Sequence, residues 1–141
     1  MSFPVKVLKD GLLEKRSSGL LQLWKKKRCV LTEEEGLRLH DCKGGDAPSP
    51  AWSSKAKELL FERMSKVDCV EYKRGVEYFT VVMASGQEID FRCPQDRSGG
   101  SWNTDISMAL MRFKNKQAMQ ASRKRHLHTA HLGSTGEDEE L

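Results

Sequence analysis

Three lysines in two neighbouring segments, Lys15, Lys25 and Lys27, have the charge and the spacing to bind an anion. Side chains alternate between the two faces of a β-strand, so Lys25 and Lys27 would share a face with Cys29. By the same rule Lys15 would share a face with Leu13. If Cys29 and Leu13 face a core, the three ammonium groups gather where that inward face ends. Lysine acts there as a point charge, and the natural ligand of such a cluster is a polyvalent anion, above all a set of phosphate groups.

A second interpretation of the lysine cluster is a basic surface that only keeps the protein soluble. A solvated strand, however, is expected to alternate charged residues with core residues. Here the charges of residues 25–28 run directly into the apolar residues 29–31. The pattern therefore favours an anion pocket at the mouth of a small sheet or barrel.

The elements that position these lysines are short strands separated by polar turns. β-Branched and aromatic residues mark the clearest strand, at residues 77–82, and apolar and charged residues alternate at 88–93. The seven strand candidates lie at residues 11–16, 24–31, 37–40, 59–61, 67–70, 77–82 and 88–93. Seven short strands predict a meander that forms a sandwich or barrel. A long flexible connection rich in glycine, proline and small residues is predicted at 42–57.

A single amphipathic helix is predicted after the strands. Ser101 suits its N-cap position, and an apolar stripe with helical spacing follows. The stripe consists of Trp102, Ile106, Ala109, Leu110 and Phe113. Such a helix is expected to cover an open end or edge of the barrel. The basic and then acidic residues of 122–141 predict a charged, disordered tail, which leaves one domain at residues 7–121.

Length and composition restrict the class of protein. The chain has 141 residues, 38% of them hydrophobic, and a formal net charge of +4, which fits one domain with a preference for acidic partners. No apolar run approaches the roughly 20 residues that span a bilayer. No secretory or lipidation signal is visible either. We therefore expect a cytoplasmic, monomeric protein whose contact with membranes is peripheral and non-covalent.

Motifs for catalysis or metal binding are not evident in the sequence. The four cysteines form no C-x-x-C pair and are expected to be reduced thiols. His126, His128 and His131 have the spacing of metal ligands, but they lie in the predicted tail without partner ligands, so solvent-exposed histidines are the simpler interpretation. No glycine-rich phosphate loop follows a strand. We expect neither enzyme activity nor a cofactor.

The pattern of seven strands and one helix resembles the pleckstrin homology (PH) fold. The motif Gly11-x-Leu13-x-Lys15 is similar to the first PH strand, residues 24–31 are similar to the second, and Trp102 stands where PH domains carry a characteristic tryptophan. The phosphoinositide signature of the PH family, a lysine followed after a variable loop by further basic residues, falls on Lys15, Lys25 and Lys27.

A narrower resemblance extends over residues 7–125, to the short members of the pleckstrin homology-like domain family A. It is carried by residues 7–17, 21–32, 66–71, 88–93 and 113–115. The resemblance implies a cytosolic protein that binds phosphoinositides at membranes with broad specificity. Short members of that family restrain growth and Akt signalling, one of them by occupying the lipids that Akt needs.

The resemblance also implies roles for residues around the lysine cluster. The headgroup would be bound by the three lysines of the signature. A wider basic field near the membrane is expected from Arg16, Lys26, Arg28 and Lys57. Leu20 and Leu21, at the tip of the first loop, would either enter the membrane interface or fold back onto the barrel.

Two departures from the family pattern argue for weak and promiscuous headgroup binding. Lys27 stands where the signature usually has arginine, so bidentate phosphate recognition is lost. Leu39 stands where selective PH domains often place a phosphate-binding tyrosine. In the 42–57 connection, Lys55 and Lys57 would flank the pocket.

Two other functions remain open. A protein-interaction adaptor would use the same fold to bind a peptide or a GTPase, with the lysines incidental. A nucleic-acid-binding protein would use the basic strand to contact phosphates, but the cations are interleaved with no base-stacking aromatic residue beyond Trp24. We therefore do not expect a nucleic-acid partner.

Overall fold

The computed structural model describes residues 5–42, 56–95 and 100–132. In these ranges the chain forms seven strands, a short 3-10 helix and one α-helix. The elements are β1 (Val7–Arg16), β2 (Trp24–Thr32), β3 (Gly36–Asp41), β4 (Lys57–Leu60), η1 (Phe61–Arg63), β5 (Met64–Lys73), β6 (Val76–Met83), β7 (Glu88–Pro94) and α1 (Trp102–Leu132). The predicted class, a mainly β fold of the PH type with one C-terminal helix, is confirmed.

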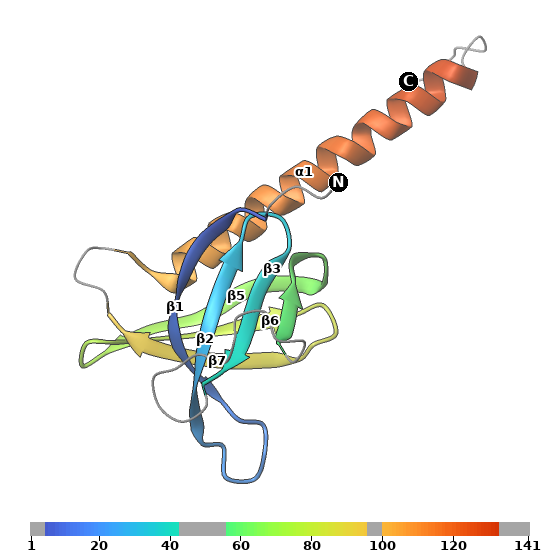
Figure 1. The fold of residues 1–141 in the computed structure, drawn as a ribbon. Helices are drawn as coiled ribbons and strands as arrows, with labels where there is room; N and C mark the ends of the chain where they lie inside the picture. The colour runs from blue at the N-terminus through green and yellow to red at the C-terminus, as the bar shows by residue number, and fades with distance from the viewer. Residues whose placement is uncertain (1–4, 43–55, 96–99, 133–141) are drawn as a thin grey trace.

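All seven strands belong to one antiparallel sheet with the order β4-β3-β2-β1-β7-β6-β5. The first and last halves of the chain meet where β1 pairs with β7, at Glu14 with Arg92 and at Lys15 with Phe91. Strands β1–β3 cross the layer of β5–β7 at a steep angle, so the sheet folds over and encloses its own inner face (Figure 1). Lys15 therefore lies at the junction of the two layers.

The core fills the space between these layers. Three phenylalanines, Phe61, Phe79 and Phe91, are fully buried, and the rings of Phe79 and Phe91 stack with their centroids 5.4 Å apart. On β1 and β2 the residues that alternation assigned to the inner face, Leu13 and Cys29, are also buried. The inward face from which the lysines extend is thus a true core face.

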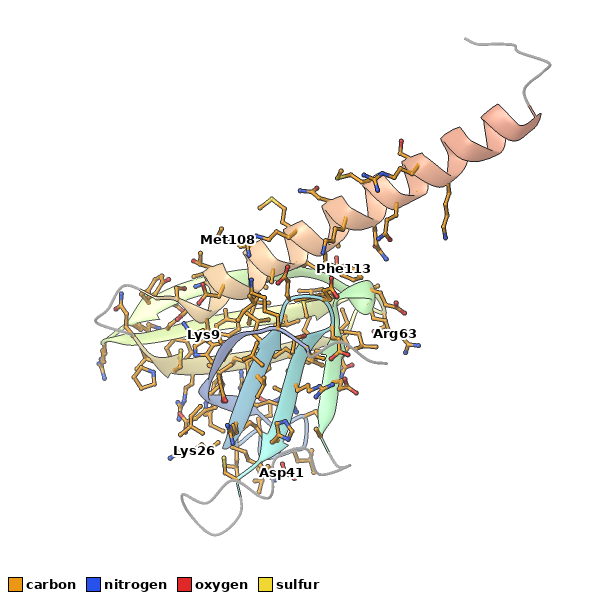
Figure 2. The ribbon with its side chains drawn as sticks, turned by 45° about the horizontal axis from the view of Figure 1, so that its top comes forward. Lys9, Lys26, Asp41, Arg63, Met108 and Phe113 are labelled. Carbon is orange, nitrogen blue, oxygen red and sulfur yellow. The ribbon has the colours of Figure 1, made fainter. Side chains whose placement is uncertain are left out.

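Helix α1 covers the sheet with its first three turns only. Four residues of the predicted stripe are buried, and the fifth, Phe113, packs against Phe61 with ring centroids 5.5 Å apart. A Cβ atom on Gly11 would lie 3.2 Å from Cζ2 of Trp102, so the first turn of α1 packs directly on β1. The ammonium group of Lys116 still pairs with Glu34 (3.0 Å), and beyond it the helix projects from the sheet (Figures 1 and 2). Met108 lies on the exposed side of the helix.

The start of α1 is fixed by a buried carboxylate on β6. Glu77 is 2% exposed, and its Oε2 accepts hydrogen bonds from Ser101 Oγ (2.9 Å) and from the backbone N–H of Asn103 (3.1 Å). The side-chain amide of Asn103 also donates to the same oxygen. A negative charge at the N-terminal end of a helix is favourable, because the first N–H groups have no partner within the helix.

Several predicted boundaries differ from the structure, and the boundary between helix and tail differs most. Residues 122–132, predicted as the start of a disordered tail, continue α1. The reason is local: the sequence has no glycine or proline from residue 101 to residue 132, and charge alone does not end a helix. The predicted connection 42–57 lies mostly outside the described residues, as does 133–141, and Lys57 belongs to β4. Among the described helices, none is long and apolar enough to cross a bilayer.

Candidate anion-binding site

The register of β1 and β2 brings the three predicted lysines together. Lys15 lies directly opposite Lys25, and Lys27 lies opposite Leu13. All of these side chains are on the inner face, because each is separated from a buried residue by an even number of positions. The sequence-based placement of the three lysines on one face is therefore correct.

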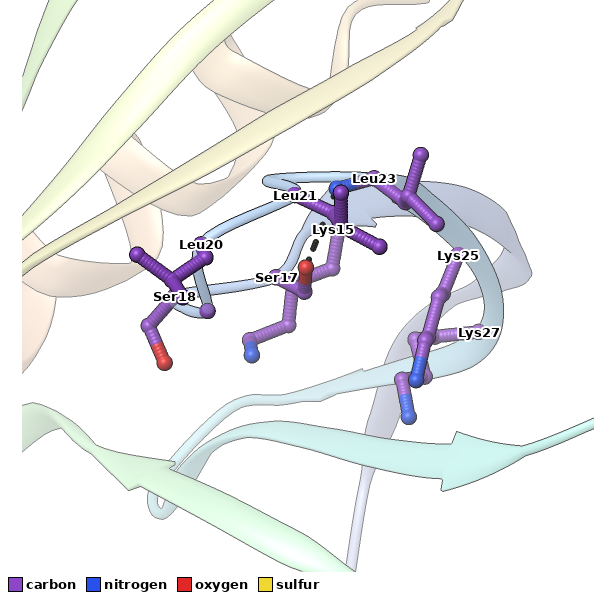
Figure 3. Close-up of a pocket in the computed structure, with 9 residues that line it drawn as sticks. Lys15, Ser17, Ser18, Leu20, Leu21, Leu23, Lys25 and Lys27 are labelled. Carbon is purple, nitrogen blue, oxygen red and sulfur yellow. Dashed lines mark hydrogen bonds between the residues drawn. The ribbon is translucent and has the colours of Figure 1, made fainter.

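The three lysines line an open cavity of about 650 Å³ beside the β1–β2 loop. The rest of its lining comes from that loop, namely Ser17, Ser18, Gly19, Leu20, Leu21 and Leu23. The loop is closed at its base by the backbone N–H of Ser17, which donates to the carbonyl of Leu23 (2.8 Å), and by the N–H of Leu23, which donates to Ser17 Oγ (3.0 Å). Figure 3 shows the three ammonium groups pointing to the same side of this hairpin.

A fourth lysine, Lys57 on β4, lies close enough to affect the electrostatics of the cavity. Burial lowers the pKa of Lys15, and the charges of Lys57, Lys27 and Lys25 lower it further, in that order. Each positive neighbour makes the protonated form of Lys15 less favourable. The site is therefore short of negative charge, and a bound anion would relieve the repulsion.

One carboxylate, which was not predicted from the sequence, also takes part in the cluster. Asp41 lies opposite Lys27 in the β2–β3 register and forms an ion pair with its ammonium group. It also raises the pKa of Lys15, against the effect of the lysines. The alternation of Leu37, Leu39 and Asp41 on β3 places all three on the inner face, so this pattern contains the signal for Asp41.

Three further basic residues of β1 and β2, Arg16, Lys26 and Arg28, lie on the opposite face of the sheet. Arg28 donates two hydrogen bonds to the carboxylate of Asp10, from Nε (3.0 Å) and from Nη2 (2.7 Å), and these lower the pKa of Asp10. Arg16 donates to the side-chain oxygen of Gln22 (2.6 Å) and lies 3.7 Å from the carboxylate of Asp90.

Arg16, Lys26 and Arg28 therefore do not line the cavity, because odd-numbered and even-numbered positions of a flat strand face opposite ways. Two of them, Arg16 and Arg28, are also matched by carboxylates. Their contribution to a wider positive field stays a prediction. Lys26 lies at the end of the sheet away from α1, where Figure 2 also shows Asp41.

The leucines of the β1–β2 loop point into solvent. Leu20 is fully exposed and Leu21 is 78% exposed, so the loop does not fold back onto the barrel. Leu23, which the sequence analysis did not single out, is more than half exposed as well. Exposed apolar side chains grouped beside a cationic cavity are typical of a surface that meets a partner rather than bulk water.

Other candidate chemistry is not assembled in the part of the chain that the structure describes. No group of histidine, cysteine and acidic side chains is arranged there to hold a metal ion. The side chains of His126, His128 and His131 lie outside the described residues. Burial raises the pKa of the Cys29 thiol, which makes it a core residue rather than a nucleophile.

Comparison with known proteins gives close relatives along nearly the whole chain, although no family model matches it. The chain is 58% identical to pleckstrin homology-like domain family A member 3 of Danio rerio, over 94% of this chain and 93% of that protein. It is 47% identical to member 2 of Xenopus tropicalis, over 90% of this chain and 85% of that protein. It is 45% identical to member 2 of Homo sapiens, over 92% of this chain and 78% of that protein.

Proposed function

Because the chain belongs to the pleckstrin homology-like domain family A, we propose that it is a non-catalytic module that binds phosphoinositide headgroups in the lysine-lined cavity. The observation that carries this proposal is the convergence of Lys15, Lys25 and Lys27 on one open cavity. Lys57 adds a fourth positive charge nearby. Phosphate groups are the anions whose charge and size suit several ammonium groups at once.

The chemistry of the cavity supports weak binding with broad headgroup specificity. Its cations are all lysines, which act as point charges, whereas arginine would fix the orientation of a phosphate with two hydrogen bonds. Basic residues near an anionic membrane contribute about 1 kcal/mol each. Binding that rests on a few such charges is modest and falls as salt is added.

The position of the exposed leucines supports docking on a membrane surface. Leu20 and Leu21 line the same cavity as the lysines, so a headgroup in the cavity would bring them to the bilayer interface. Helix α1 projects from the sheet away from the β1–β2 loop (Figure 1). In this orientation the protein is peripheral on the inner face of the plasma membrane, whose anionic lipids attract the cavity.

Regulation would follow from mass action. Each bound copy covers one phosphoinositide and denies it to other proteins that need the same headgroup. A sufficient number of copies would compete with Akt-type effectors for lipid and so restrain growth signalling. This role needs no catalysis and no cofactor, and it works with a monomer.

A second candidate function is a protein-interaction adaptor, because other exposed apolar side chains lie outside the lining of the cavity. They include Met108, Met111 and Met119 on α1 and Val70 and Tyr72 on β5. An adaptor would bind a peptide or a GTPase there and would not depend on the lysines. A nucleic-acid-binding role gains no support. Trp24, the aromatic residue at the start of the basic strand, packs against the guanidinium of Arg92 (4.5 Å from the ring centroid) and against Tyr78, so its ring is already in contact with the protein rather than open to a base.

Sedimentation with vesicles separates these functions. We expect the wild-type chain to sediment with phosphatidylcholine vesicles that contain phosphatidylinositol bisphosphate and not with phosphatidylcholine alone. Changing Lys25 and Lys27 together to alanine is expected to abolish the binding while the thermal unfolding temperature stays close to that of the wild type.

The matched control changes Lys66 and Lys73 to alanine. Both are exposed lysines on β5, so the control removes the same amount of positive charge at a distance from the cavity lining. It should bind like the wild type apart from a small loss. Equal binding by the Lys25/Lys27 variant and this control would refute the lipid proposal and favour the adaptor.

A further inference from the structure

The carboxylate of Asp41 already pairs with one of the three lysines that line the cavity. Lys27 and Asp41 are register partners on β2 and β3 and share the inner face, and Lys27 lines the cavity. Their side chains form an ion pair. A phosphate that binds the Lys27 ammonium group must therefore share it with Asp41 or displace the carboxylate.

The two partners differ in their exposure to solvent. The side chain of Lys27 is 21% exposed, whereas that of Asp41 is 58% exposed. The lysine stem is thus held by the protein, and the carboxylate is the more accessible partner. An exposed ion pair is weak, so an incoming polyvalent anion can replace Asp41 at modest cost.

Asp41 also offsets the repulsion among the lysines of the empty cavity. The ammonium groups of Lys25, Lys27 and Lys57 repel that of Lys15, and the carboxylate of Asp41 acts on Lys15 in the opposite direction. The same negative charge repels an anionic ligand. One side chain therefore stabilises the empty cavity and weakens the filled one.

We propose that Asp41 is an internal counter-ion that competes with headgroup phosphates for Lys27 and thereby limits the affinity of the cavity for phosphoinositides. This inference rests on the proposed function, since it concerns the same cavity and ligand. Asp41 acts through Lys27 and is a positioning residue rather than a ligand-binding one. By limiting this affinity, Asp41 would also limit how many copies of the protein bind to a membrane with a given phosphoinositide content.

The test is the substitution Asp41→Asn, which removes the charge and keeps the shape. It is expected to tighten binding to phosphatidylcholine vesicles containing phosphatidylinositol bisphosphate by about three- to fivefold, the range that corresponds to an exposed ion pair. The affinity should also fall more steeply with added salt, because one more lysine is free to engage phosphate.

The matched control is Glu71→Gln, since this carboxylate is also 58% exposed and pairs with a lysine, Lys73, on β5. Strands β6 and β7 separate it from β1 in the sheet. It changes the net charge by the same amount and should alter vesicle binding and its salt dependence much less. Equal gains from the two substitutions would overturn the inference and assign the effect to net charge.

The variant Lys27→Ala shows whether Asp41 acts through Lys27. In a Lys27→Ala background the gain from Asp41→Asn should shrink to that of Glu71→Gln, and an undiminished gain would overturn the competition. If Asp41→Asn unfolds at a lower temperature, Asp41→Ser serves as the second variant, and no gain in affinity from either folded variant contradicts the inference.

The two proposals fail in different ways. If wild-type binding to these vesicles needs Lys25 and Lys27 but Asp41→Asn does not tighten it, only the counter-ion inference is wrong. If the wild-type chain does not bind these vesicles, the proposed function itself is wrong and the inference falls with it.

Discussion

Lys15 and Lys25 lie directly opposite each other on β1 and β2, so two ammonium groups on the inner face form a cross-strand pair. Like charges in this arrangement destabilise a sheet. Local sequence preference and stability would favour an apolar or oppositely charged partner here. A pair that opposes folding and lines a cavity is expected where function, rather than stability, determines the residues.

Replacing Lys15 with methionine should therefore stabilise the protein and weaken vesicle binding. We expect a gain of about 0.5 kcal/mol in the free energy of unfolding at neutral pH, within the range for cross-strand pairs. Chemical denaturation measures the gain, and vesicle sedimentation measures the loss. The control Lys66→Met removes a paired, exposed lysine and should not stabilise the protein.

The pH dependence of this gain has a definite sign. The folded state lowers the pKa of Lys15, so the protonated side chain costs stability below that pKa. The cost disappears as the pH rises through the ordinary lysine value of about 10.4, because both states are then neutral. The advantage of Lys15→Met should accordingly be full at neutral pH and absent in strongly alkaline solution, and a gain that persists there would contradict the explanation.

The exposed leucines of the β1–β2 loop should matter for membranes and not for folding. Changing Leu20 and Leu21 together to serine is expected to leave the free energy of unfolding unchanged, because neither side chain is buried. Vesicle binding should weaken about fivefold, since partial insertion of two leucines contributes on the order of 1 kcal/mol.

A matched control for the leucine variant is Leu12→Ser combined with Met119→Ser, which removes two half-exposed apolar side chains elsewhere. Binding to a soluble inositol bisphosphate should be equal in all three proteins. If the leucine variant and the control bind vesicles equally well, the loop does not enter the membrane.

Glu77 should be the carboxylate that most strongly couples the sheet to α1. The substitution Glu77→Gln replaces an acceptor oxygen with an amide near donors of Ser101 and Asn103. We expect a loss of about 2 kcal/mol in the free energy of unfolding, as for a buried hydrogen-bonded group left without a partner. Hydrogen exchange should accelerate at residues 102–106, whereas exposed Glu71→Gln should change neither quantity.

The strands and the core could be predicted well because both depend on short-range alternation. At β7, apolar residues alternate with charged ones, and the burial of the strand follows this pattern. Strand β6 could be predicted from its β-branched and aromatic residues. The first residues of β1, before Gly11, were not predicted. They are strand because they pair with the end of β2, for example Val7 with Thr32, and such pairing is not visible in a local window.

The candidate site could be predicted only in part. The lysines on β1 and β2 were placed correctly because the two strands form one hairpin and share a register. Asp41 and Lys57 lie on β3 and β4, and their proximity to Lys15 depends on how the sheet curves. The length of α1 was underestimated because charged residues were taken as a sign of disorder, although they are good helix formers.

Titration of the isotope-labelled chain with soluble inositol bisphosphate, followed by amide chemical shifts, shows whether the lysine-lined cavity binds the headgroup. We expect saturable shifts that are largest at residues 15–27 and extend to Asp41 and Lys57. Unphosphorylated inositol should cause no shifts, and the Lys25→Ala/Lys27→Ala variant should show none with the bisphosphate. Shifts that centre on β5 or on α1, or an absence of saturable shifts, would contradict the assignment of the cavity to phosphoinositide headgroups.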